Sequence, residues 1–252
     1  FNGKVTNNGT IQNSTFKGGV TNDGTISDST FQNRYMVTNS GTITRGTFQN
    51  GCIVTNNSNI SDGTFQNGCS VTNSSTGKIS GGIFTCDVTN NGTIKDNGTF
   101  EGSVENKGTN AIIENGTFNG QVENRGTINN GTFERFVINE GSIEKGTIEN
   151  GTFNGTVTNK GNIKNGTFKR RVTNDQRSIY GGTFAAGLSE NHGHIYHGVF
   201  HGNTALTTKA HKVTVTNGSV LKVNDEAPRK EDGTEDTAWD LYAYAGTTVT
   251  IT

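Results

Sequence analysis

The stretch VTNKGNIKNGTF, residues 157–168, holds the three large apolar residues of one repeat, Val157, Ile163 and Phe168. The same order recurs along most of the chain with the consensus V-T-N-x-G-T-I-x-x-G-T-F-x-G-x. Thirteen of the 14 Phe residues belong to this pattern, and successive members are mostly 15 to 17 residues apart. Helical repeats need about 33 residues or more, so the short period indicates another kind of repeat.

The residue types of the repeat favour strands and turns. Val, Ile and Phe favour strands, Asn and Gly supply tight turns, and polar Thr beside each apolar residue gives the period-2 alternation of a half-buried strand. We therefore expect an all-β fold, a single-stranded, three-sided parallel β-solenoid (a β-helix) with a right-handed coil. It would contain about 12 coils of mostly 15–17 residues.

Such a solenoid would align equivalent residues in columns that run from coil to coil. Phe rings would stack, and the Asn that lies two residues after each Val would form a ladder of amide hydrogen bonds. The three Cys lie two residues before Val in consecutive coils, as small buried thiols or with one disulfide between neighbours. The predicted structural stacks comprise Phe48, Phe65, Phe84, Phe100, Phe118, Phe133, Phe153, Phe168, Asn39, Asn56, Asn73, Asn90, Asn106, Asn124, Cys52, Cys69 and Cys86.

The composition is consistent with a repeated core and restricts the classes of partner that we expect. Only 29% of the residues are apolar, and the chain contains 36 Gly and one Pro. A solenoid needs only one or two inward residues per strand, so this inventory suffices. The net charge of −1 gives no reason to expect a nucleic acid partner, and no apolar stretch is long enough to span a membrane.

Two regions depart from the repeat. Twenty residues separate Val137 from Val157, and with Ile143 in the Ile column we interpret the later G-T-I of this stretch as an extra unit. Repeats are expected over 1–202, followed by a C-terminal β-strand cap over 203–252. The cap would contain a hairpin between Lys212 and Val223, or a further strand pair of the stack there, and a charged loop over 224–237. Because residue 1 already lies within a repeat, we expect the chain to be part of a longer protein.

Residues that could carry chemistry are few. Glu105 and Glu123 lie one coil apart, a spacing that would suit a retaining glycosidase, but Lys107 and Arg125 follow in the same coils and favour a salt-linked surface. Two histidines are weak candidates for a metal site. We expect no enzyme activity, no catalytic or cofactor-binding residues and no cofactor. The two weak metal candidates are His192 and His194.

The low-insertion repeat, rich in Asn, Gly and Thr, resembles the β-solenoid stalks of bacterial surface and secreted adhesin-like proteins over about 1–202. The resemblance implies an extracellular or cell-surface location and a structural or adhesive role, with a host or environmental glycan or protein as partner. Coil ends would also permit end-to-end self-association.

Three other functions stay open. The general plan is similar to that of pectate-lyase-type β-helices, which suggests a carbohydrate-binding or carbohydrate-processing β-helix as the first alternative. A filament-forming scaffold of the bactofilin-like kind is a lesser one. Insect-type ice-binding solenoids resemble the chain in their ordered outward Thr columns. The expected Thr column here comprises Thr15, Thr30, Thr47, Thr64, Thr99, Thr117, Thr132, Thr152, Thr167 and Thr183.

Overall fold

The structure is a computed structural model that describes residues 1–32, 34–140, 146–175, 177–191, 194–195, 199–200, 204–206, 221–223 and 249–251. Every regular element in these residues is a β-strand, so the all-β prediction is confirmed. Within the same residues no helix has the length and hydrophobicity needed to cross a membrane. The chain divides into two compact units, Phe1–Glu134 (unit 1) and Arg135–Thr252 (unit 2).

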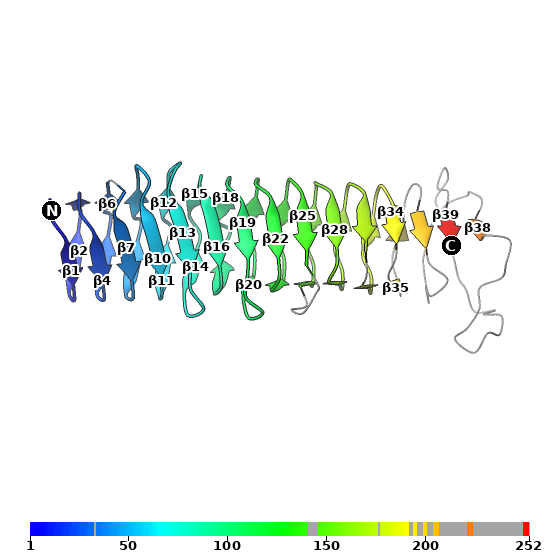
Figure 1. Cartoon of the computed structure of the whole chain (residues 1–252), viewed down its shortest axis with the longest axis horizontal. Helices are drawn as coiled ribbons and strands as arrows, with labels where there is room; N and C mark the ends of the chain where they lie inside the picture. Colours follow the sequence, from blue (N-terminus) through cyan, green and yellow to red (C-terminus); the bar gives the residue numbers. More distant parts are fainter. Residues whose placement is uncertain are drawn as a thin grey trace. The chain divides into compact units, whose positions relative to one another are not determined.

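Unit 1 consists of coils that contribute one strand to each of three parallel sheets, here called A, B and C (Figure 1). Sheet A contains β1 (Val5–Asn7), β4 (Val20–Asn22), β7 (Met36–Asn39), β10 (Ile53–Asn56), β13 (Ser70–Asn73), β16 (Asp87–Asn90), β19 (Val104–Asn106) and β22 (Val122–Asn124). Sheet B contains β2 (Thr10–Gln12), β5 (Thr25–Ser27), β8 (Thr42–Thr44), β11 (Asn59–Ser61), β14 (Lys78–Ser80), β17 (Thr93–Lys95), β20 (Ile112–Ile113) and β23 (Thr127–Ile128). Sheet C contains β3 (Thr15–Phe16), β6 (Thr30–Phe31), β9 (Thr47–Phe48), β12 (Thr64–Phe65), β15 (Ile83–Phe84), β18 (Thr99–Phe100), β21 (Thr117–Phe118) and β24 (Thr132–Phe133).

Unit 2 continues the same pattern within itself. Sheet A here contains β25 (Val137–Asn139), β28 (Val157–Asn159), β31 (Val172–Asn174) and β34 (Leu188–Asn191). Sheet B contains β26 (Thr147–Ile148), β29 (Asn162–Ile163), β32 (Ser178–Ile179) and β35 (His194–Ile195). Sheet C contains β27 (Thr152–Phe153), β30 (Thr167–Phe168), β33 (Thr183–Phe184) and β36 (Val199–Phe200).

Equivalent residues of neighbouring coils pair directly. In sheet A, Val54 pairs with Val37 on one side and with Val71 on the other. In sheet C, Phe65 pairs in the same way with Phe48 and Phe84. This parallel, in-register pairing confirms the predicted three-sided β-solenoid.

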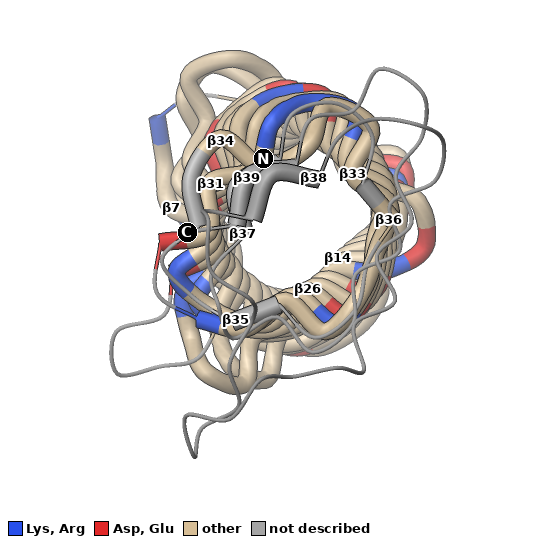
Figure 2. The backbone as a smooth tube through the Cα atoms, turned by 90° about the vertical axis from the view of Figure 1, so that its right-hand side faces the viewer, with Lys and Arg blue, Asp and Glu red and all other residues tan. Residues whose placement is uncertain are grey.

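The coil is right-handed, as expected. In Figure 1 the coils of unit 2 follow one another from β28 to β34 toward the side from which Figure 2 is viewed. In Figure 2 sheet A of unit 2 (β31) lies at the upper left, sheet B (β26) at the bottom and sheet C (β33) at the right, so the order A, B, C runs counterclockwise. A chain that turns counterclockwise as it approaches the viewer follows a right-handed path.

The inward columns form a continuous core in each unit. The Val, Ile and Phe side chains of the inner coils are 0–2% exposed. In unit 1 the Phe rings stack nearly parallel, with centroids 4.3 to 5.2 Å apart. Two measured stacks in unit 2 are 4.7 Å apart. Repetition therefore gives a dense apolar core from a chain with few apolar residues.

The predicted Asn ladder is also confirmed. In unit 1 the Nδ2 of each Asn donates to the Oδ1 of the next coil's Asn at 2.7–2.8 Å, from Asn7 to Asn124. Asn139, Asn159 and Asn174 continue the arrangement within unit 2. Most of these amides also donate to backbone carbonyls of the turn that follows sheet A, as Asn22 does to Gly24 at 3.1 Å. The ladder thus fixes both the stacking of coils and the corner between sheets A and B.

The position of the five-residue insertion in unit 2 was predicted wrongly. Ile148, rather than Ile143, occupies the Ile column, because β26 pairs Ile148 with Ile163. The Nδ2 of Asn139 donates to the carbonyl of Gly146 at 3.1 Å, and the Gly146 N–H donates to the carbonyl of Glu140 at 2.8 Å. Gly146 therefore takes the turn position of the repeat. The insertion comes before it, at residues 141–145, which lie outside the described residues.

A separate parallel sheet follows the coils of unit 2. It contains β37 (Thr204–Leu206), β39 (Val249–Ile251) and β38 (Leu221–Val223), in that order. β38 belongs to the predicted hairpin, and its described partner is β39, to which it runs parallel. The first hairpin strand, its turn and the charged loop 224–237 lie outside the described residues, and the boundary between 202 and 203 stays a prediction.

Candidate functional site

One corner of unit 1 is longer in three consecutive coils than in the others. Three residues usually connect the Phe of sheet C to the Val of sheet A, as residues 101–103 do between Phe100 and Val104. Five residues make this connection at 32–36, 49–53 and 66–70. Their described residues form what we call the widened corner. It adds two residues to the usual connection in each of the three coils.

The backbone of the widened corner is shaped by residues in the left-handed region. Asn50, Gly51 and Gly68 have φ of 57°, 82° and 82°. Gly and Asn adopt this conformation most readily. A Cβ built on Gly51 would lie 3.3 Å from the Cγ of Arg34, so the alkyl part of Arg34 lies directly against this glycine. The missing side chain at Gly51 allows the arginine to rest on the next coil.

A pocket of about 580 Å³ opens at the widened corner. Apart from the backbone of two glycines it is lined by polar side chains and one aliphatic side chain. Within the described residues, no hydrogen bond or ion pair engages the side chains of Arg34, Asn50 or Asn67. The lining consists of Arg34, Asn50, Gly51, Ile53, Asn67 and Gly68.

Exposed apolar side chains adjoin this pocket. Tyr35, Met36 and Ile53 are 52%, 58% and 47% exposed. Met36 and Ile53 pair in register at the start of β7 and β10, so they are neighbours on the outer face. Single exposed apolar residues are common, but three together beside free polar groups are typical of binding surfaces.

The Cys column lies on the inner side of the same corner. Cys52, Cys69 and Cys86 are buried, and no disulfide joins these three residues. The Sγ of Cys52 lies 3.1 Å from the carbonyl of Gln49, and the Sγ of Cys69 lies 3.5 Å from that of Phe48. These small side chains fill the space beneath the corner.

The three thiols have different environments, which shift their pKa values in different directions. A hydrogen bond between the Cys52 and Cys69 thiols raises the pKa of Cys52 and lowers the pKa of Cys69 to about 6. Burial raises the pKa of Cys86 to about 12. Among the described residues, no three His, Cys, Asp or Glu side chains are grouped so that they could hold a metal ion.

The paired glutamates of sheet A are linked by an arginine. Arg125 lies within ion-pair distance of both Glu105 and Glu123, and Lys107 lies 3.7 Å from Glu105. All four side chains are partly exposed. Because Arg125, from the coil of Glu123, pairs with the carboxylates of both coils, we interpret this group as a salt-linked surface.

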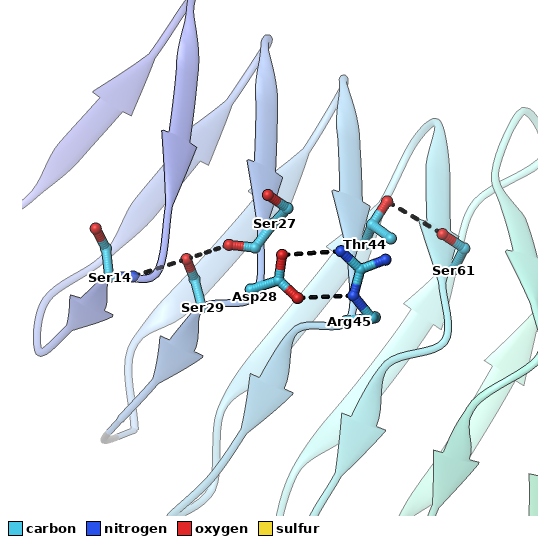
Figure 3. A network of polar contacts seen from close by, with 7 residues as sticks. All are labelled: Ser14, Ser27, Asp28, Ser29, Thr44, Arg45 and Ser61. Carbon is cyan, nitrogen blue, oxygen red and sulfur yellow. Dashed lines mark hydrogen bonds and ion pairs between the residues drawn. The ribbon is translucent and has the colours of Figure 1, made fainter.

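A second polar group lies at the corner between sheets B and C. Asp28 and Arg45 form a two-pronged ion pair, with N–O distances of 2.7 and 2.8 Å (Figure 3). This hydrogen bonding lowers the pKa of the exposed Asp28 carboxyl. Both residues adopt the left-handed conformation, with φ near 50°. Their N–H groups donate to the carbonyls of Thr44 and Ser61 in the following coils.

Hydroxyl groups extend this network from coil to coil (Figure 3). Ser29 accepts a hydrogen bond from the N–H of Ser14 and donates to the carbonyl of Ser27. Ser61 donates to the hydroxyl of Thr44 at 3.2 Å. Since these groups satisfy one another, the network acts as a connector between coils and leaves little free for a ligand.

The outward Thr column of sheet C is a single column. In unit 1 the Thr residues pair in register from Thr15 onward, and Ile83 interrupts the series between Thr64 and Thr99. The residue after each Phe already belongs to a corner, so sheet C provides no second Thr column.

The structure adds no support for the two histidines that were predicted as weak candidates for a metal site. His192 lies outside the described residues. His194 begins β35, where its backbone pairs with Ser178. The widened corner was missed by the sequence reasoning, although its signal is visible as five residues between Phe31 and Val37 against three between Phe100 and Val104.

Comparisons with protein-family models, curated proteins and solved structures find no match to this chain. The fold itself therefore gives its class, a parallel β-solenoid repeat protein. The function has to be inferred from the outward residues.

Proposed function

We propose that this chain is a non-enzymatic structural or adhesive rod of a larger protein that is secreted or displayed on a bacterial cell surface. The proposal rests on one observation, the different roles of the inward and outward residues. The columns that recur in nearly every coil are buried and satisfied by one another. Their role is to hold the coils, which leaves the outward face for recognition.

The chemistry of the outward groups supports a role without catalysis. The one carboxylate pair with a spacing of interest, Glu105 and Glu123, is engaged by Arg125. The pair therefore suits charge compensation better than glycoside hydrolysis.

Location is the first test of this proposal. Antibodies against the purified chain should label intact, unpermeabilised cells of the producing organism or be detected in its culture medium. Labelling that requires permeabilisation, with no protein in the medium, would contradict a surface or secreted rod. A cytoplasmic marker protein in the same cells shows that the membranes are intact.

A carbohydrate-binding β-helix is the second candidate, and the widened corner favours it. Free amide and guanidinium groups beside exposed apolar side chains suit a ligand with hydroxyls and an apolar face. A reducing-end assay on polysaccharides separates binding from processing. New reducing ends that appear with the wild-type chain would contradict the non-enzymatic proposal.

A further inference from the structure

We propose that the widened corner of unit 1 binds an acidic saccharide, in which Arg34 pairs with the carboxylate and the amides of Asn50 and Asn67 bind ring hydroxyls. Ile53, with Met36 beside it, would contact the apolar face of the sugar. The inference rests on the proposed adhesive function and names the ligand class that this site accepts.

The charge of the ligand follows from Arg34. Within the described residues this guanidinium has no acidic partner, whereas Arg45 and Arg125 are each bound to carboxylates. A guanidinium forms strong, two-pronged hydrogen bonds with a carboxylate. Gly51 supports the alkyl part of Arg34, which restricts the side chain before the ligand arrives. An anionic group is therefore the natural occupant of this end of the pocket.

The polar part of the ligand follows from the two asparagines. Asn50 and Asn67 occupy equivalent positions in consecutive coils, two residues after Phe48 and Phe65. Each amide offers two donors and an acceptor oxygen. A free phosphate, which mainly accepts hydrogen bonds, would leave the amide oxygens without donors. Sugar hydroxyls both donate and accept, so they can satisfy both ends of each amide.

The apolar part follows from the outer face of sheet A. Ile53 lines the pocket, Met36 pairs with it in register, and Tyr35 precedes Met36 in the chain. A sugar ring carries C–H groups on one face, which can cover such side chains while the hydroxyls reach the amides. The pocket volume of about 580 Å³ lies within the range of about 300–1,000 Å³ usual for small-ligand sites.

The proposal is tested by titrating the full chain in a calorimeter with a panel of uronic acid oligosaccharides. Each oligosaccharide is measured beside its counterpart in which the carboxylate is reduced to a hydroxymethyl group. We expect at least one acidic oligosaccharide to bind about tenfold or more tightly than its reduced counterpart, the size of one charge-assisted hydrogen bond.

Three variants localise the binding. Arg34→Gln should remove the preference for the acidic form, and Asn67→Ala should weaken both forms. Arg45→Gln, an exposed arginine at a different corner, is the matched control and should bind like the wild type. All three positions are outside the core, and a thermal unfolding curve close to that of the wild type verifies folding.

Three outcomes would overturn the inference. They are a chain that binds no acidic oligosaccharide, an Arg34→Gln variant that keeps the preference, and binding of an acidic peptide with equal affinity. None of them would contradict the proposed rod function if the protein is still found outside the cell, because such a rod could use another ligand. A protein absent from the surface and the medium would contradict the rod function separately.

Discussion

The Nδ2 of Asn73 lies 2.7 Å from the Oδ1 of Asn90, one coil further along, and both side chains are fully buried. Asn73 also accepts from Asn56 at 2.8 Å and donates to the carbonyl of Gly77 at 3.0 Å. One side chain therefore connects three coils and a turn. A buried amide of this kind is stabilising only while every neighbour keeps its partner.

Replacement of this amide should destabilise unit 1 strongly. Asn73→Leu has a similar volume but removes both ladder bonds, and we expect a loss of roughly 2 to 4 kcal/mol in urea unfolding. Asn59→Ala, at an exposed position of β11, is the control and should change stability by at most about 0.5 kcal/mol. Equal effects of the two changes would contradict the structural role of the ladder.

The Phe stack gives a second prediction. Phe118 is fully buried between Phe100 and Phe133, with centroids 4.9 and 4.8 Å away. Phe118→Ala should lower the free energy of unfolding by roughly 3–5 kcal/mol. Phe1→Ala, which removes a ring that is 56% exposed, should cost clearly less in the same measurement. A similar cost for both would show that the stack is not a packed core.

Two glycines of unit 1 test how closely the coils approach. A Cβ on Gly120 would lie 2.0 Å from the carbonyl oxygen of Gly102 in the preceding coil, whereas a Cβ on Gly9 would have nothing within 4 Å. Gly120→Ala should therefore cost roughly 1–3 kcal/mol or more, because backbone atoms must move. Gly9→Ala should be nearly neutral. Thermal unfolding of the two variants compares them, and an unaffected Gly120→Ala variant would refute the close contact.

The carboxyl of Asp28 should titrate below its ordinary pKa of 3.8 because Arg45 is bound to it. The ion pair therefore stabilises the fold above pH 3.8, and this stabilisation is lost as the pH falls through the lowered pKa of Asp28. NMR titration should show the pKa of Asp28 rising toward 3.8 in Arg45→Gln. The pKa of Asp96, which Ser80 and Lys95 lower, should be the same in this variant as in the wild type. If the pKa of Asp28 were the same in Arg45→Gln as in the wild type, the ion pair would be absent in solution.

The Cys column predicts an order of reactivity. Since the pKa of Cys69 is lowered to about 6 and that of Cys86 is raised to about 12, Cys69 should be alkylated first at pH 8. Burial should slow all three thiols relative to the unfolded chain. Mass spectrometry after timed iodoacetamide treatment measures the order, and Cys86 reacting first would contradict it.

The sequence was sufficient for the coil and its core, because the residues that build them recur at a fixed spacing. The columns that contain Phe118 and Asn73 can be read from the repeat alone. The insertion near Ile148 was misplaced because G-S-I-E-K and G-T-I-E-N are alternative matches to the same consensus. The register of Ile148 with Ile163 and the hydrogen bonds of Gly146 distinguish the two.

The candidate site was harder to predict because it consists of deviations from the repeat. Corner spacing could have shown where the chain is longer, but spacing does not give the direction of Arg34 or show that the side chains of Asn50 and Asn67 lack partners among the described residues. The left-handed conformation of Asp28 and Arg45 was equally invisible, since neither residue type requires it. Local backbone geometry, rather than residue identity, decides which polar groups remain available.

The central claim is that the repeated columns are scaffold and that the widened corner is the functional surface. It is tested most directly by replacing each five-residue corner with the three-residue sequence of residues 101–103 and titrating this variant with the acidic oligosaccharides. We predict cooperative unfolding close to that of the wild type and the loss of saccharide binding. A folded variant that still binds the same oligosaccharide with wild-type affinity would contradict the claim.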